Sequence, residues 1–183
     1  MSKLGHSFLR ESAKYLGEVY LPRIERALAI LPEKDLWRRP HRDVISVGMI
    51  LQHLDGNVRQ WILSGLGGES DARARATEFE KHERATAAEL LANLRSTVEQ
   101  SAALIAGLSK HELKRSHRIQ DFEVTGLDAI YHVVEHFSWH TGQLVWLAKA
   151  CAGRDHGLSF YDTAAINAAH NAPDTPDDSA SKS

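Results

Sequence analysis

The stretch from Thr125 to Cys151 constrains the fold most, because it is the longest uninterrupted helical pattern in the chain. Thr125 with Asp128 three residues later resembles a capping box, which marks the start of a helix. The apolar residues that follow recur at helical spacing: Ile130, Val133, Val134, Phe137, Val145 and Leu147. We therefore expect a long helix that is covered on most sides and lies in or near the core.

This helix carries three histidines in one register: His132, His136 and His140. Each step of four residues climbs ~6 Å and rotates ~40°, which keeps the side chains on one face. Adjacent members can point at a common atom, whereas the outer two diverge too far to share one small ion. A neutral imidazole in an apolar wall needs a partner for its nitrogens. A metal ion is one such partner, and a backbone carbonyl or a carboxylate is another.

Apolar periodicity predicts three further amphipathic helices, over residues 7–31, 47–64 and 86–108. Pro22 lies within the first of them and removes a backbone donor, which predicts a kink near residues 18–21. Four long amphipathic helices predict an all-α fold, a four-helix bundle.

The connections between the helices differ in length and composition. Residues 65–84 form a long polar connection, which predicts a crossover between the second and third helices. Its arginine-rich part, residues 71–75, is expected to be a solvated loop. Residues 109–124 alternate weakly and suggest a short extended segment or hairpin, and residues 153–170 suggest a short irregular or helical return. We expect residues 1–170 to form a single domain and residues 171–183, which lack apolar content, to form a disordered tail.

Composition narrows the function classes. The net charge of −2 with scattered Lys and Arg argues against binding to nucleic acid or to a membrane surface. The single cysteine, Cys151, cannot form an internal disulfide, and we expect it to be a small buried residue. No apolar run is long enough to span a bilayer, and the start of the chain lacks the apolar region of a signal peptide. A cytoplasmic location is expected.

A second apolar helix face carries His53, next to Met49 and Ile50. Together with His136 and His140, His53 could fill three positions of a tetrahedral metal and leave the fourth for water or substrate. Zinc is the first expectation, and nickel and iron(II) also tolerate three imidazoles. The alternative is that these are satisfied core histidines, because pairs at this spacing arise by chance in a chain with eleven histidines.

Four neighbouring residues can each be interpreted in more than one way. Glu135 could orient a ligand histidine or act as a general base on water at the site, or it could be a solvated charge. His132 could support the ligands from outside or be a hydrogen-bonded core residue. Asn57 and Gln143 could hydrogen-bond a substrate, tie two helices together, or cap a buried carbonyl.

Two segments, HLDGNVRQW at 53–61 and HVVEHFSWHTGQ at 132–143, resemble the DinB-like superfamily of bacterial four-helix metalloproteins. The segments YLPRIE and DARARATEFE are similar to an uncharacterised branch of it. The resemblance implies an up-up-down-down bundle whose three metal ligands fall on His53, His136 and His140. It also implies metal-dependent transferases that use a low-molecular-weight thiol, or hydrolase-type enzymes, with frequent dimers.

Three hypotheses follow. The first is a divalent-metal-dependent enzyme that transfers a low-molecular-weight thiol to an electrophilic small molecule, with metal-dependent hydrolysis as the alternative chemistry. The second is a non-enzymatic, metal-stabilised homodimer that acts as a binding or stress-response module. The third is a metal-free bundle. An open coordination position would favour the enzyme, and a closed site with four protein ligands would favour the module.

Overall fold

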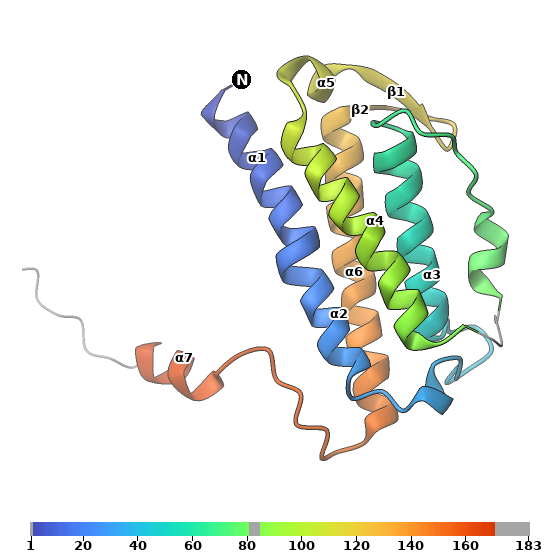
Figure 1. Cartoon of the computed structure of the whole chain (residues 1–183). Coiled ribbons are helices and arrows are strands. Elements are labelled where there is room, and N and C mark those ends of the chain that lie inside the picture. Colours follow the sequence, from blue (N-terminus) through green and yellow to red (C-terminus); the bar gives the residue numbers. More distant parts are fainter. Residues whose placement is uncertain (1, 81–84, 171–183) are drawn as a thin grey trace, which may run out of the picture.

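A computed structural model describes residues 2–80 and 85–170, and four helical rods lie side by side in it (Figure 1). The first rod comprises α1 (Lys3–Lys14), a π-helical segment η1 (Tyr15–Tyr20) and α2 (Leu21–Leu28). It begins four residues before the predicted start, because the Ser2 hydroxyl accepts the Gly5 N–H and caps it.

A π-helical segment lies where a kink was predicted before Pro22. The N–H of Leu21 donates to the carbonyl of Leu16, five residues back, instead of following the α-helical pattern. Because proline cannot donate to the preceding turn, a local change of hydrogen-bond register there lets the rod continue.

The other three rods are α3 (Val47–Val58), extended by a π-helical segment η3 (Arg59–Ser64), α4 (Ala87–Gly107) and α6 (Gly126–Ala152). Their starts are fixed by local side-chain caps. Ser46 accepts the N–H of Met49, and Thr86 and Thr125 each form the predicted capping box. The all-α class and these helix starts are therefore confirmed.

The directions of the rods follow from contacts at their ends. Trp37, which precedes α3, donates its indole N–H to the carbonyl of Ala85, which precedes α4. At the other end, a Cβ on Gly67, just after η3, would collide with Leu104 near the end of α4. Consequently α3 and α4 are parallel, whereas the first rod and α6 run the opposite way (Figure 1).

This order differs from the up-up-down-down order that the resemblance implied. In the order seen here, the rods run down, up, up and down. An up-up-down-down bundle needs two long crossovers, one for each parallel pair of consecutive helices. Among the four described rods only one consecutive pair is parallel, and it is joined by the predicted long crossover between η3 and α4. A short 3₁₀ helix of that crossover, η4 (Arg75–Phe79), packs against α3.

The polar segment between α4 and α6 contains α5 (Lys110–Lys114) and an antiparallel hairpin of β1 (Ser116–Ile119) and β2 (Phe122–Thr125). Gln120 and Asp121 form its two-residue turn, with φ angles of 51° and 66°. Positive φ at both positions suits the turn types whose twist matches a hairpin. The predicted hairpin is thus confirmed, and it closes the end of the bundle where α6 begins (Figure 1).

The core lies between the four rods. Phe137 of α6 is completely buried, and Tyr20 of the first rod stacks on it at 6.1 Å between ring centroids. After α6 the chain returns through residues 153–162 to a short helix, α7 (Thr163–His170). None of the described helices is long and apolar enough to cross a membrane. The predicted disordered tail, residues 171–183, lies outside the described residues.

Candidate metal centre

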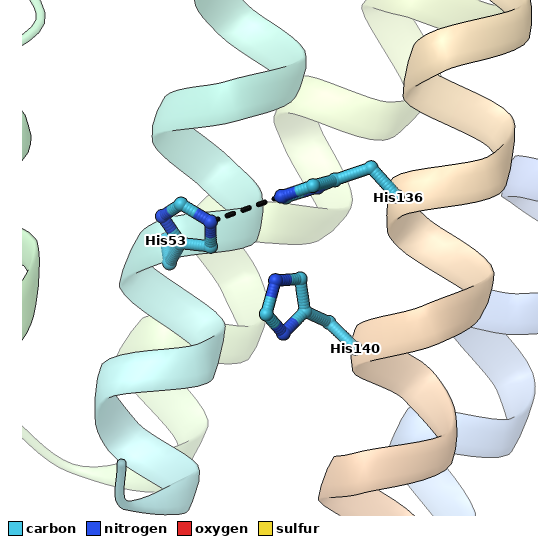
Figure 2. A group of neighbouring side chains, drawn as sticks. All are labelled: His53, His136 and His140. Carbon is cyan, nitrogen blue, oxygen red and sulfur yellow. Dashed lines mark hydrogen bonds between the residues drawn. The ribbon is translucent and has the colours of Figure 1, made fainter. Parts of the chain in front are cut away.

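Three histidines from two rods face one another in the middle of the bundle. His53 comes from α3, and His136 and His140 come from successive turns of α6 (Figure 2). One potential ligand atom from each lies within 4.8 Å of the other two, and the Nε2 atoms of His53 and His136 are 3.0 Å apart. Two nitrogens on one tetrahedral zinc ion, each ~2.05 Å from it, lie about 3.3 Å apart. The group could therefore hold a divalent cation.

Burial favours the neutral form of the imidazoles of His136 and His140. Burial lowers the pKa of His136 to about 3, and the positive charges of its neighbours His140 and His53 push it the same way. Burial also lowers the pKa of His140, and so does His53, although a hydrogen bond with Gln143 opposes the shift. Because both pKa values are lowered, these rings carry free lone pairs at neutral pH, the form that binds a metal.

Hydrogen bonds to the outer nitrogens decide which ring atom faces the group. The Nδ1 of His53 donates to Glu78 Oε2 at 2.8 Å, and the Nδ1 of His140 donates to Gln143 Oε1 at 2.7 Å. Protonation at Nδ1 leaves Nε2 of both rings as the acceptor that can bind a cation. Gln143 thus orients the ring of His140 from the same helix, a contact that differs from the roles expected for it.

Glu78 and Arg73 were not recognised from the sequence. Arg73 grips both oxygens of Glu78, through Nε at 2.6 Å and Nη2 at 2.8 Å, and also donates to Gln60 Oε1 at 2.8 Å. The expectation of a solvated loop over residues 71–75 is wrong for Arg73, whose side chain is only 4% exposed. Burial alone would raise the pKa of Glu78, but the hydrogen bonds from Arg73 and His53 outweigh it and lower the pKa.

The remaining predicted residues lie beside the group. His132 is outside it and packs against Trp61, with 4.0 Å between ring centroids and the ring planes tilted by 34°. Its Nε2 is 3.5 Å from the amide nitrogen of Asn57, which is buried. Both residues thus lie at the packed contact of α3 and α6, in agreement with a core role. Glu135 is exposed and lines a groove on the outer face of α6, so its role as a base stays a prediction.

The composition of the group bears on its chemistry. Among the described residues, no fourth His, Cys, Asp or Glu joins the three histidines. A tetrahedral cation held by three imidazoles keeps one position free of protein ligands, which is the arrangement of reactive rather than structural zinc sites.

Comparison with known proteins supports the fold. The crystal structure of YjoA, a DinB-like protein from Bacillus subtilis, superimposes with a TM-score of 0.59 at 18% identity, and the match covers 84% of this chain and 96% of that one. At this identity the likeness speaks for the fold alone, and no curated protein matches the sequence. The DinB-like resemblance is nevertheless confirmed at the level of architecture. Residues 3–159 match the protein family of unknown function DUF1572, and the chain therefore belongs to that family.

Proposed function

We propose that the protein is a divalent-metal-dependent enzyme and that His53, His136 and His140 bind its cation. The observation that carries this proposal is the three-histidine group without a fourth protein ligand among the described residues. Imidazoles from two different rods converge there, and the outer nitrogens of His53 and His140 are already engaged in hydrogen bonds. A satisfied core histidine would instead turn its nitrogens to protein partners, as Nε2 of His132 is turned toward Asn57.

The chemistry we propose is transfer of a low-molecular-weight thiol to an electrophilic small molecule. A divalent cation, when bound, lowers the pKa of a thiol or a water at its open position. The thiol would lose its proton to solvent, its sulfur would form a bond to the electrophilic carbon, and the displaced group would leave with the electron pair of the broken bond. The choice of a thiol rests on the DinB-like resemblance, and metal-assisted hydrolysis is the alternative.

Within the chain, Nε2 atoms of the three histidines would hold the cation, while Gln143 and Glu78 would hold the rings of His140 and His53. Zinc suits three nitrogen ligands in tetrahedral geometry, and nickel and iron(II) remain alternatives. Cys151 is not a competing nucleophile, because burial raises the pKa of its thiol. It is also unpaired, which is compatible with the reducing cytoplasm that we propose as the location.

The test compares three proteins purified identically: the wild type, the triple variant His53→Ala, His136→Ala and His140→Ala, and the control His132→Ala. Elemental analysis should find about one divalent metal per chain in the wild type and the control, and none in the triple variant. Equal metal content in wild type and triple variant would refute the proposal. Consumption of cysteine or glutathione in the presence of 1-chloro-2,4-dinitrobenzene, measured with and without chelator, tests the transfer step.

The same samples distinguish the alternative chemistry. If the wild type binds metal but does not accelerate thiol consumption, hydrolysis of p-nitrophenyl acetate should be followed instead. Chelator-sensitive hydrolysis that is absent from the triple variant would select the hydrolase.

A second candidate function, a dimeric binding module, is favoured by the outer face of α6. Four large apolar residues on this face are between 44% and 64% exposed: Leu127, Tyr131, Trp139 and Trp146. Such residues are common at protein interfaces, and we propose that they meet a second copy of the chain. Light scattering at several concentrations should give the mass of a dimer for the wild type and of a monomer for a Trp139→Ser, Trp146→Ser variant. A monomeric wild type would reject this candidate.

A further inference from the structure

The crossover between η3 and α4 reaches the candidate metal centre through one carboxylate. We propose that Glu78, held in place by Arg73, is a positioning residue that orients the ring of His53. Metal binding to His53 then strengthens the packing of residues 71–79 of the crossover against α3. This inference rests on the metal-binding function proposed above and assigns a role to a segment that does not itself belong to the three-histidine group.

Glu78 and its two partners form a buried chain of hydrogen bonds. The carboxylate lies between the imidazole of His53 and the guanidinium of Arg73, and their side chains are 8%, 7% and 4% exposed. A buried carboxylate is costly unless it is paired, and Arg73 pairs with both of its oxygens. Glu78 is therefore ionised and can only accept hydrogen bonds, so the Nδ1 of His53 must donate one to it.

The helix beneath leaves room for this carboxylate. Gly56 lies in the last turn of α3, where the rod continues into η3, and a Cβ at that position would collide with Oε1 of Glu78. Glycine is among the least favourable residues in a helix interior, so its presence here needs a reason, and the close approach of Glu78 supplies one.

A second contact joins the same segment to the same ligand. The ring of Phe79 packs beside His53 at 5.1 Å between centroids, and the Arg75 guanidinium lies 5.3 Å from the centroid of the Phe79 ring. The end of η4 thus fixes both the hydrogen-bonding direction and the tilt of the imidazole. Neither contact is made by His136 or His140, whose helix lies on the far side of the group (Figure 2).

Two consequences follow. Because Nδ1 donates outward, Nε2 of His53 is the atom presented to a cation, and the carboxylate makes this ring a stronger ligand. Because a docked crossover then strengthens metal binding, a bound metal must strengthen docking of the crossover by the same factor.

Zinc affinity, measured by competition with a chromophoric chelator, tests the first consequence. Glu78→Gln should bind zinc roughly 10- to 100-fold more weakly than wild type, the usual effect of losing such a partner. Glu69→Gln, the same change at an exposed ion pair with Arg59, should bind like wild type.

Gly56→Ala gives an independent second variant, because it displaces the carboxylate while every charge and ligand stays in place. It should also weaken zinc binding by at least about 10-fold. Its matched control is Gly142→Ala on α6, where an added Cβ meets nothing within 4 Å. The metal-free variants should unfold cooperatively near the wild-type temperature, which separates lost positioning from a general loss of structure.

Hydrogen exchange tests the second consequence. Amides of residues 71–79 should exchange more slowly with zinc than without it in the wild type, and this difference should disappear in Glu78→Gln. If the wild type binds zinc tightly and both variants bind it equally well, the inference is overturned while the metal function stands. If the wild type itself binds no divalent metal, the proposed function falls and the inference falls with it.

Discussion

Removing the metal should lower the thermal stability of this protein by a calculable amount. At neutral pH the ring of His136, with a pKa of about 3, has no proton to lose on binding, and its Nε2 is already 3.0 Å from that of His53. Metal binding therefore does not have to displace a proton from His136, and it does not require a large movement of the two rings. A ligand at 100 times its dissociation constant stabilises the folded state by about 2.7 kcal/mol. For a chain of 183 residues, each kcal/mol shifts the unfolding temperature by about 2–4 °C.

We therefore expect the zinc-loaded protein to unfold about 5–11 °C above the chelated protein. Differential scanning calorimetry on matched samples, with zinc held at about 100 times the measured dissociation constant, gives the value. The triple histidine variant should show no zinc-dependent shift, which excludes a general effect of the salt or the chelator. A wild-type unfolding temperature that is the same with zinc and with chelator would refute the coupling of metal binding to folding.

Three further predictions concern single positions. His136→Ala should lose bound metal and His132→Ala should retain it, as measured by elemental analysis, and metal loss in both would place His132 among the ligands. Gly48→Ala should destabilise the fold by about 1–3 kcal/mol in urea unfolding, since its Cβ would come within 2.7–2.9 Å of the Trp37 ring; an unchanged midpoint would mean that the ring can move away. Leu94→Ala, at a fully buried position of α4, should cost about 2–5 kcal/mol in the same assay, and a loss below 1 kcal/mol would contradict its place in the core.

The helices could be predicted because their signals are local. The capping boxes that begin at Thr86 and Thr125, and the hydroxyl cap at Ser46, each depend on residues three apart in the sequence. The apolar period then carries each helix onward, and it also separates buried from exposed positions along α6. The long polar connection after η3 correctly indicated a crossover, because two parallel neighbours cannot be joined by a tight turn.

The direction of each rod could not be obtained in this way. Periodicity is the same whichever way a helix runs, and the order taken from the resemblance concerned a superfamily rather than this chain. The distinguishing contacts, such as the one from Trp37 to Ala85, join residues 48 positions apart. The spacing of His136 and His140 likewise places both on one helix face. It does not identify the third histidine of the group, because any of several histidines could have packed against them.

The burial of Arg73 and Glu78 could not be predicted from sequence patterns. Both lie in a polar segment with the composition of a solvated loop, and charged residues in such segments are normally exposed. Burial here depends on three contacts that no periodicity encodes: from Arg73 to Glu78, from Glu78 to His53, and from Glu78 to the space above Gly56. A glycine within an apolar helix, one turn from a candidate ligand, was the one local sign that another group approaches the helix closely there. If Gly56→Ala leaves zinc affinity unchanged, Gly56 is needed only for packing of the crossover against α3. In that case only the hydrogen bond to His53 connects the Glu78 carboxylate to the metal.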